Sequence, residues 1–266
     1  MADFILEIRN LSREFKLGGI VFGKKIVAVD QVSLTLPADQ SQILSIVGES
    51  GSGKTTLARM ILRLLEPSSG EIILDGVPLS HFQKQQFLKN VQPIFQNPFS
   101  TFSARKAIET YLFETALNLR GVKTKKQAKE VIADVLRSVG LEISHVLGKY
   151  PNQFSGGELQ RISIARALIP KPKLIVADEP VAMIDASLRT NIVNLFKRLK
   201  DEYRVNFIYI THDLSTAYYV SDYIATMYKG SMIEFGAAKS ILNNPAHPYT
   251  ELLLNSIPKV GDKWDD

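Results

Sequence analysis

A buried strand that leads directly into a glycine-rich turn constrains this chain more than any other feature. The apolar run 43–47 is nearly continuous, as expected of a strand covered on both faces. The eight residues that follow, 48–55, match the pattern G-x-x-x-x-G-K-[ST], and a helical pattern continues over 55–65. A strand, a loop and a helix in this order predict a cradle for phosphate groups at the helix N-terminus.

Each residue type in this loop suits the binding of a nucleoside triphosphate. Glycines let the backbone approach phosphate groups without a Cβ in the way, and the loop N–H groups then face a polyanion. Lys54 is expected to reach the β- and γ-phosphates, and the Thr55 hydroxyl to coordinate Mg²⁺. The alternative is a Gly/Ser-rich turn that binds nothing, but the strand before it and the helix after it favour binding. The predicted phosphate-binding residues are Gly48, Glu49, Ser50, Gly51, Ser52, Gly53, Lys54, Thr55 and Thr56.

Two further apolar runs end in residues that carry chemistry. The run 174–177 is followed by Asp178 and Glu179, and the run 207–210 leads within two residues to His212. Taken singly, an acidic strand end is often an ordinary turn, and a lone His is more often a cap or a surface residue. In an open parallel sheet, however, ligands bind at the carboxyl ends of the strands, where these side chains would meet the phosphate loop. We therefore expect Asp178 to hold Mg²⁺, Glu179 to polarise an attacking water and His212 to contact the γ-phosphate.

The remaining patterns predict an α/β fold with two additions. Residues 4–36 alternate between apolar and polar, which indicates β structure with a glycine-containing loop at 18–23. The stretch 70–79 is typical of a hairpin with an Asp-Gly turn. Apolar positions at helical spacing over 106–149 predict a helical insertion, and strands alternating with helices return after residue 150.

Composition excludes several classes of site. The 266 residues include no cysteine, so disulfides, thiolate zinc sites and cysteine-ligated iron–sulfur clusters are ruled out. No uncharged apolar run approaches the ~18–20 residues needed to cross a bilayer, so we expect a cytosolic chain that reaches a membrane only through a partner. The formal net charge of +5 is mild for this length and does not establish nucleic-acid binding.

A second candidate anion site lies at residues 154–161. Ser155 with Glu158 three positions later forms a capping box, which would satisfy free N–H groups at the start of a helix. Apolar residues at 159, 162, 165 and 169 predict that one face of this helix is buried. The serine, the two glycines after it and the helix N-terminus could also bind an anion, and both interpretations can hold together.

At this point the chain resembles the ABC ATPase family from residue 4 to about residue 254. Residues 154–158 look like the family's signature motif, normally L-S-G-G-Q, with Phe at the first position here and Glu at the last. The resemblance implies further ATP-binding residues, namely Ser155, Gly156, Gly157, Glu158, Gln96, Asp185 and Phe15.

The resemblance also suggests a role for each of these residues. Gln96 resembles the family glutamine that senses Mg²⁺ and the attacking water, and it is counted with Thr55 and Asp178 as a metal-site residue. Asp185 resembles the aspartate of the family's D-loop, where Ala182 stands in place of the usual Ser. Phe15 looks like the aromatic residue that stacks on adenine, and an ordinary core phenylalanine is the alternative.

The fold and domain organisation implied by the family can be stated in residues. We expect a P-loop NTPase core, with a mainly parallel sheet and flanking helices, joined by an N-terminal antiparallel β subdomain and a helical signature subdomain. The ATPase domain would span 1–258, with the helical subdomain at about 100–170 and a C-terminal extension at about 236–258. Residues 259–266 would be a frayed tail.

In this family the signature of one subunit completes the ATP site of another. The resemblance thus implies ATP and Mg²⁺ as cofactors and a head-to-tail pair with a second ATPase subunit, identical or homologous. Transmembrane permease subunits would hold the pair at the cytoplasmic face of the membrane, and a solute-binding protein would act indirectly. No nucleic-acid partner is expected.

The stretch 244–250, followed by three leucines at 252–254, resembles importers of the oligopeptide/dipeptide group. Peptide uptake is therefore the favoured function, although the same branch also serves oligosaccharide and nickel uptake. An ABC ATPase acting on DNA or the ribosome is a further alternative, as is a regulatory module that does not hydrolyse ATP. About a hundred residues without sustained heptads separate the two motifs, which disfavours the coiled-coil DNA-acting members, and the residues Glu179 and His212 disfavour a module without hydrolysis.

Overall fold

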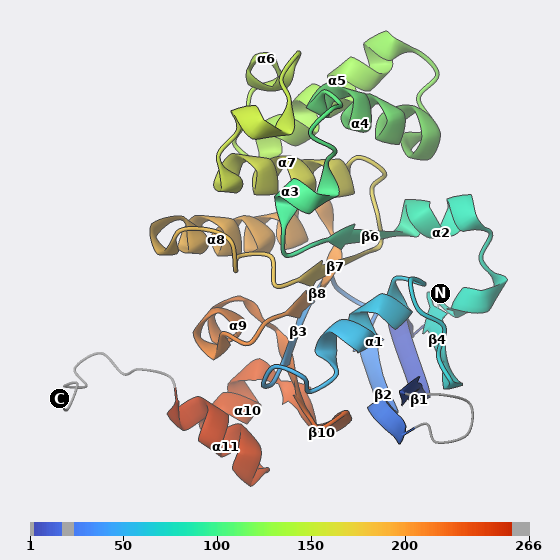
Figure 1. Ribbon diagram of the computed structural model, residues 1–266, viewed down its shortest axis with the longest axis vertical. Coiled ribbons are helices and arrows are strands. Elements are labelled where there is room, and N and C mark those ends of the chain that lie inside the picture. Colours follow the sequence, from blue (N-terminus) through green and yellow to red (C-terminus); the bar gives the residue numbers. More distant parts are fainter. Residues whose placement is uncertain (1–2, 18–23, 257–266) are drawn as a thin grey trace.

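The computed structural model describes residues 3–17 and 24–256 as an α/β fold built around two sheets (Figure 1). The predicted glycine-containing loop at 18–23 and the predicted tail at 259–266 lie outside the described residues. Within the described ranges, no helix combines the length and the apolar character that crossing a membrane requires.

The larger sheet has the strand order β10-β9-β3-β8-β7-β6. Its five strands from β9 to β6 run parallel, and β10 pairs with β9 in the antiparallel direction. All five residues of β3 are buried, as the continuous apolar run predicted. The strands are β3 (Ile43–Val47), β6 (Val91–Ile94), β7 (Leu174–Asp178), β8 (Asn206–Ile210), β9 (Tyr223–Tyr228) and β10 (Ser231–Ala237).

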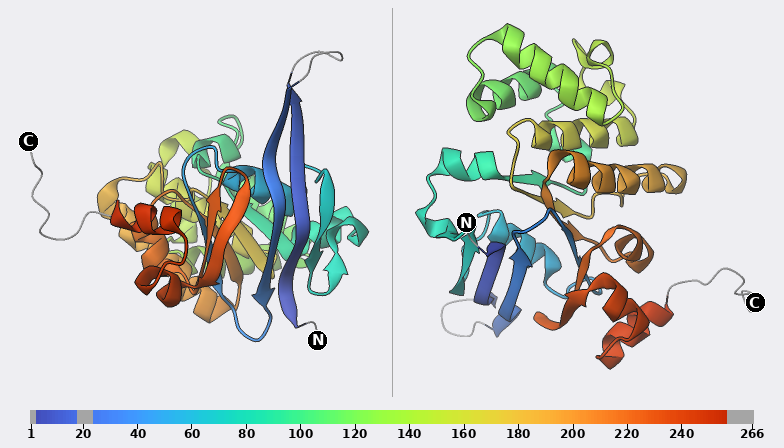
Figure 2. Two further views of the ribbon diagram at one scale, coloured as in Figure 1. Left: turned by 90° about the horizontal axis from the view of Figure 1, so that it is seen from below. Right: turned by 180° about the vertical axis from the view of Figure 1, so that it is seen from behind.

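The smaller sheet confirms the predicted N-terminal antiparallel structure. Its order is β2-β1-β4-β5, and the long strands β1 and β2 run side by side along its edge (Figure 2). The predicted Asp-Gly turn at 75–76 joins β4 to β5. The strands are β1 (Phe4–Leu17), β2 (Lys24–Pro37), β4 (Ser69–Leu74) and β5 (Val77–Pro78).

The helices form three groups in space (Figure 1). A cluster from α3 to α7 lies apart from the smaller sheet, which agrees with the predicted helical insertion. It contains α3 (Pro98–Thr101), α4 (Ile108–Thr115), the π-helical turn η2 (Ala116–Arg120), α5 (Lys125–Ser138), α6 (Ile143–Val146), the 3₁₀ turn η3 (Pro151–Gln153) and α7 (Gly156–Leu168). The helices beside the sheets are α1 (Lys54–Ile61), the 3₁₀ turn η1 (Leu79–His81), α2 (Lys84–Asn90), α8 (Ala186–Tyr203) and α9 (Leu214–Val220). The C-terminal pair is α10 (Ala238–Asn243) and α11 (Pro248–Asn255).

Alternate side chains of the central strands serve two different cores. Phe207 and Tyr209 of β8 face the cluster that includes α7 and α8, whereas Ile208 and Ile210 face the cluster with α1 and the smaller sheet. Phe196 of α8 packs edge-on against both Phe207 and Tyr209, with ring centroids 5.3 and 5.6 Å apart. The sheet is thus covered on both faces, which fixes its strand ends in space.

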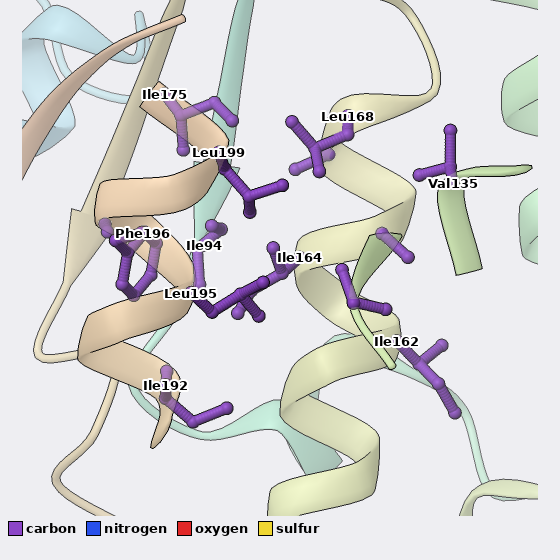
Figure 3. Close-up of a cluster of buried hydrophobic side chains, with 14 of the residues drawn as sticks. Ile94, Val135, Ile162, Ile164, Leu168, Ile175, Ile192, Leu195, Phe196 and Leu199 are labelled. Carbon is purple, nitrogen blue, oxygen red and sulfur yellow. The ribbon is translucent and has the colours of Figure 1, made fainter. Parts of the chain in front are cut away.

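The apolar face predicted for helix α7 is buried, and residues on its other sides are buried as well. Figure 3 shows its side chains Ile162, Ile164 and Leu168 at different positions around the helix, with Leu195 of α8 close by. Eight residues of α7 are buried, among them the polar Gln160 and Ser163. The sequence pattern indicated only one face because the contacts on the other side come from elements far away in the chain.

Candidate functional site

The carboxyl ends of β3, β7 and β8 meet at one edge of the larger sheet. The loop after β3, Glu179 after β7 and His212 after β8 together line a cavity of about 690 Å³. Gln96, two residues beyond β6, lines the same cavity. Parallel strands bring these segments together because all their carboxyl ends point the same way.

Two glycines in the loop occupy positions that a larger residue could not take. Gly48 has φ of +147°, and a Cβ built on it would lie 2.2 Å from the carbonyl oxygen of Met227. Gly53 has φ of +105°, and its Cβ would lie 2.3 Å from the carbonyl oxygen of Ala28. The loop is therefore wedged between β2 and β9, and its shape depends on glycine at both positions.

Lys54 lies folded over the loop rather than in solvent. Its side-chain Nζ donates to the carbonyl oxygens of Gly48 at 2.7 Å and Glu49 at 2.8 Å, and to the hydroxyl of Ser52 at 3.3 Å. Burial lowers the pKa of Lys54, and the nearby carboxylates, Glu179 first, act against that shift. A buried ammonium on the floor of an open cavity suits a polyanionic ligand, whose phosphate oxygens can replace the carbonyl contacts.

Thr55 and Asp178 form an oxygen pair suited to Mg²⁺. The Thr55 hydroxyl donates to the carboxylate of Asp178 at 3.5 Å. Burial raises the pKa of Asp178 and the charge of Glu179 adds to that rise, whereas the hydrogen bond from Thr55 and the charges of Arg59 and Lys54 act against it. In the described parts of the chain, no group of three or more His, Cys, Asp or Glu is placed to hold a metal ion. Two protein oxygens plus phosphate is the arrangement that Mg²⁺ commonly takes beside a nucleotide, so these residues fit the ion.

Glu179 is held in a strained conformation and points at His212. Its φ of +49° lies in the left-handed region, which costs a non-glycine residue about 1 kcal/mol or more. The carboxylate accepts from the backbone N–H of His212 at 3.0 Å and lies 2.7 Å from the ring Nδ1. The Thr211 hydroxyl donates to its other oxygen at 3.5 Å. Only 15% of the Glu179 side chain is exposed, against 67% for His212, so the carboxylate is fixed while the imidazole faces open space.

The signature residues lie at the N-terminus of α7, in a different place. The predicted capping box is confirmed: the Ser155 hydroxyl accepts from the N–H of Glu158 at 3.3 Å, and the Glu158 carboxylate accepts from the N–H of Ser155 at 2.9 Å. The Ser155 N–H, and the Ser155 hydroxyl that also donates to this carboxylate at 2.8 Å, lower the pKa of Glu158, and His145, 2.8 Å away, adds to the effect. Ser155, Gly157 and Glu158 line a separate cavity of about 290 Å³.

The remaining predicted residues do not line the cavity at the strand ends. Asp185 is exposed at the start of α8, and its side chain makes no cap hydrogen bond there. Phe15 lies on β1 opposite Ile26, with the guanidinium of Arg13 4.8 Å from the centre of its ring. Its predicted role in adenine stacking therefore stays a prediction.

Two residues that line the cavity were missed from the sequence. Ala28 of β2 and Leu253 of α11 both contribute to its wall. Ala28 carries no chemical signal in the sequence, and Leu253 lies about 200 residues beyond the loop. The stretch 244–250 was the one available hint, although the pattern gave no physical role for it.

Family models match two parts of the chain. The model described as ABC transporter matches residues 29–182, and the model described as oligopeptide/dipeptide transporter, C-terminal region, matches residues 233–266.

Relatives of known name match nearly the whole chain. The oligopeptide transport ATP-binding protein AmiF of Streptococcus pneumoniae is 38% identical over 97% of this chain and 83% of its own length. The protein of the same description, AppF of Bacillus subtilis, is 38% identical over 96% of this chain and 79% of its own.

Solved structures agree with the fold. CbiO1 from Clostridium perfringens, part of the ABC transporter complex cbiONQ, has a TM-score of 0.77 at 24% identity over 91% of this chain and 92% of that one. The ATP-binding cassette MJ0796, a dimer bound to ADP and Pi after hydrolysis, has a TM-score of 0.74 at 26% identity, over 88% of this chain and 98% of that one. With the phosphate loop, the acidic strand end and the signature helix in place, the chain belongs to the ABC transporter family, as one of its ATP-hydrolysing subunits.

Proposed function

We propose that this chain hydrolyses ATP to drive the uptake of peptides through membrane subunits encoded separately. The observation that carries the proposal is that the phosphate loop, Glu179 and His212 line one cavity. Asp178 joins them through its hydrogen bond from Thr55, which lines the same cavity. The peptide assignment is supported by the family model for the oligopeptide/dipeptide C-terminal region and by relatives described as oligopeptide transport ATP-binding proteins.

The cavity residues divide the work of hydrolysis between them. The loop N–H groups and the Lys54 ammonium bind the triphosphate, and the Thr55 hydroxyl with the Asp178 carboxylate holds the metal site. Bound Mg²⁺ neutralises charge that develops on the phosphate oxygens. Glu179 orients the attacking water and accepts its proton at a carboxylate oxygen as the bond from the water oxygen to the γ-phosphorus forms. The bond between the γ-phosphorus and the bridging oxygen breaks in the same step, and ADP leaves with that oxygen. The His212 imidazole, held at Nδ1 by Glu179, reaches the γ-phosphate from the other side, and Gln96 completes the wall.

The signature residues act on the ATP of a second subunit in this proposal. Ser155 and Gly157 line a cavity separate from the one at the phosphate loop, so within one chain they do not touch the same ligand. A head-to-tail pair would bring each signature onto the γ-phosphate held by its partner. ATP then favours the closed pair, and hydrolysis removes the link that holds it, so ATP and ADP differ in affinity for the two states.

Membrane permease subunits would convert this closing and opening into transport. The pair would therefore work at the cytoplasmic face of the membrane, held there by the permeases, and a solute-binding protein outside would deliver the peptide. Copurification of the chain with permeases and with its partner ATPase would identify these subunits directly.

Uptake of a labelled peptide tests the proposal in cells. Glu179→Gln in the chromosomal gene is expected to abolish uptake of a radiolabelled oligopeptide, because the ATPase cycle stops. Glu130→Gln is the matched control, since it makes the same chemical change on the exposed side of α5 and should leave uptake intact. If the Glu179→Gln strain takes up peptide normally but loses uptake of another solute, that solute and not peptide is the one transported.

A further inference from the structure

The C-terminal helix α11 lies against the outside of the phosphate loop. Tyr249, in the first turn of α11, accepts a hydrogen bond at its hydroxyl from the backbone N–H of Glu49 at 3.1 Å. The Tyr249 residue is only 8% exposed, although it lies 200 positions from its partner in the sequence. A buried contact across this distance ties the end of the chain to the residue that follows Gly48.

The residues before Tyr249 fix where its hydroxyl points. The carboxylate of Glu234 on β10 accepts from the N–H groups of Ala246 and His247, at 2.8 and 3.3 Å. His247 is the N-cap of α11, and its Nδ1 accepts from the N–H of Tyr249 at 3.0 Å. The ring of Tyr249 packs against Tyr228, at the end of β9, with centroids 4.3 Å apart. This network gives the stretch 244–250 a physical role, which is to hold one aromatic side chain in place.

The backbone of Glu49 is held on both sides as a result. Its N–H donates to Tyr249, and its carbonyl oxygen accepts from the Nζ of Lys54 at 2.8 Å. The same ammonium is expected to bind phosphate. The Tyr249 hydroxyl is thus one contact removed from the group that receives the ligand.

A second residue of α11 reaches the cavity itself. Leu253 lies four positions after Tyr249, on the same face of the helix, and lines the cavity with the phosphate loop. Its neighbour Leu252 is 63% exposed and is absent from that wall. One face of α11 therefore carries both the contact to the loop and part of the cavity wall.

We propose that α11 is part of the nucleotide site, with Tyr249 as a positioning residue that holds the phosphate loop in its binding conformation and Leu253 as an apolar wall. The proposal rests on the proposed binding of ATP by this loop. A loop fixed before the ligand arrives loses less conformational entropy on binding, so removing the hydroxyl should weaken ATP binding. The step most affected is binding rather than chemistry, because Tyr249 touches neither the Asp178–Glu179 pair nor His212 in the structure.

Tyr249→Phe removes a single oxygen and keeps the ring packed on Tyr228. In the purified full-length chain, we expect the Kd for the fluorescent analogue mant-ATP and the KM for ATP to rise about 3- to 10-fold, the range of one neutral hydrogen bond. The kcat should change less than twofold, and the melting temperature should stay close to that of the wild type. Tyr218→Phe is the matched control, because that ring on α9 is 58% exposed.

Hydrogen–deuterium exchange gives a readout that does not depend on activity. Peptides covering residues 43–57 should exchange faster in Tyr249→Phe than in the wild type without nucleotide, and as slowly as the wild type in Tyr218→Phe. A lower melting temperature with unchanged exchange, KM and Kd would mean that Tyr249 only docks α11, and would overturn the positioning role.

Leu253→Ala tests the wall independently, with Leu252→Ala as its control. We expect Leu253→Ala to raise the Kd for mant-ATP about threefold or more and Leu252→Ala to leave it unchanged. Equal affinity for mant-ATP in Leu253→Ala and Leu252→Ala would overturn the wall assignment. This test holds even if Tyr249→Phe fails to fold. Failure of the proposed function looks different: the wild type itself would not bind mant-ATP, and Lys54→Ala would not differ from it.

Discussion

The two anion-binding regions of this molecule are built in opposite ways. At the phosphate loop, residues that follow β3, β6, β7 and β8 converge on one large cavity. The charged side chain of Lys54 lies there, and this residue is only 7% exposed. At the N-terminus of α7, the groups come from neighbouring residues of one capping box, and Ser155 is exposed. The first region is organised by the whole fold, whereas the second needs only a local turn.

This difference indicates which region can bind a ligand alone. The strand-end region has a buried ammonium, a pair of oxygens for a metal ion and a carboxylate on a strained backbone, so its shape is fixed before a ligand binds. The α7 region offers a helix N-terminus and a hydroxyl already engaged by Glu158, and its cavity is less than half as large. It therefore behaves as half of a site, which a partner's bound nucleotide would complete.

The largest effect should follow from Glu179→Gln. An amide cannot accept the proton of the attacking water, so kcat should fall by a factor of about 10²–10⁴ while ATP still binds. Steady-state phosphate release measures the first effect, and mant-ATP titration the second. Glu130→Gln serves as the control again. Turnover that survives in Glu179→Gln would remove this residue from the chemistry.

Lys54→Ala should separate the two regions by affinity. Loss of a buried ammonium that contacts phosphate is expected to raise the Kd for mant-ATP about 100-fold in the isolated chain. Lys171→Ala, which removes an exposed lysine in the turn between α7 and β7, is the control. If Lys54→Ala binds as tightly as Lys171→Ala, the cavity at the strand ends is not the nucleotide site.

Ser155→Ala sharpens the comparison from the other side. The isolated chain should bind mant-ATP with unchanged affinity, because Ser155 does not line that cavity. ATP-driven association with the second subunit should weaken about tenfold, as measured by analytical ultracentrifugation in the Glu179→Gln background. Loss of the N-cap costs about 1 kcal/mol, so Ser155→Thr, which keeps the cap, controls for stability. Equal loss of mant-ATP binding in Ser155→Ala and Lys54→Ala would contradict the division into two half-sites.

The smallest effect concerns stability without ligand. Burial raises the pKa of Asp178, so the folded chain holds this proton more tightly than the unfolded chain does. The carboxylate therefore destabilises the fold above that pKa, and the penalty is lost as the pH falls through it. Asp178→Asn should melt about 1–3 °C higher than the wild type at pH 7.5, with a smaller gain near pH 5, while losing Mg²⁺-dependent hydrolysis. A lower melting temperature of Asp178→Asn at both pH values would show that the ionised carboxylate of Asp178 does not destabilise the fold.

Local patterns were enough to predict the parts of the fold that depend on few residues. The continuous apolar run of β3 and the glycines after it place the phosphate loop, since a buried strand and a tight turn leave distinct residue types. The capping box at Ser155 and Glu158 was predictable because both partners lie within four residues.

Long-range contacts set the limit of that reasoning. Helix α7 is buried on more than one face because α8 and the strands cover the side opposite the helical cluster, and no local spacing encodes this. The contact between Tyr249 and Glu49 spans 200 positions. At Gly53, the backbone of Ala28, which belongs to the other sheet, leaves no room for a side chain. The position of Phe15 on a strand was predictable, whereas its predicted stacking on adenine stays a prediction.

The most direct test of two complementary half-sites is a structure of Glu179→Gln with Mg²⁺ and ATP, solved in complex with its partner ATPase subunit. We expect the triphosphate on residues 48–56, with Lys54 Nζ within hydrogen-bond distance of its oxygens and the metal ion between Thr55 and Asp178. The signature serine of the opposite subunit should touch the γ-phosphate. Lys54 still bonded to the carbonyls of Gly48 and Glu49, with the nucleotide bound elsewhere or touched by one subunit alone, would contradict the account.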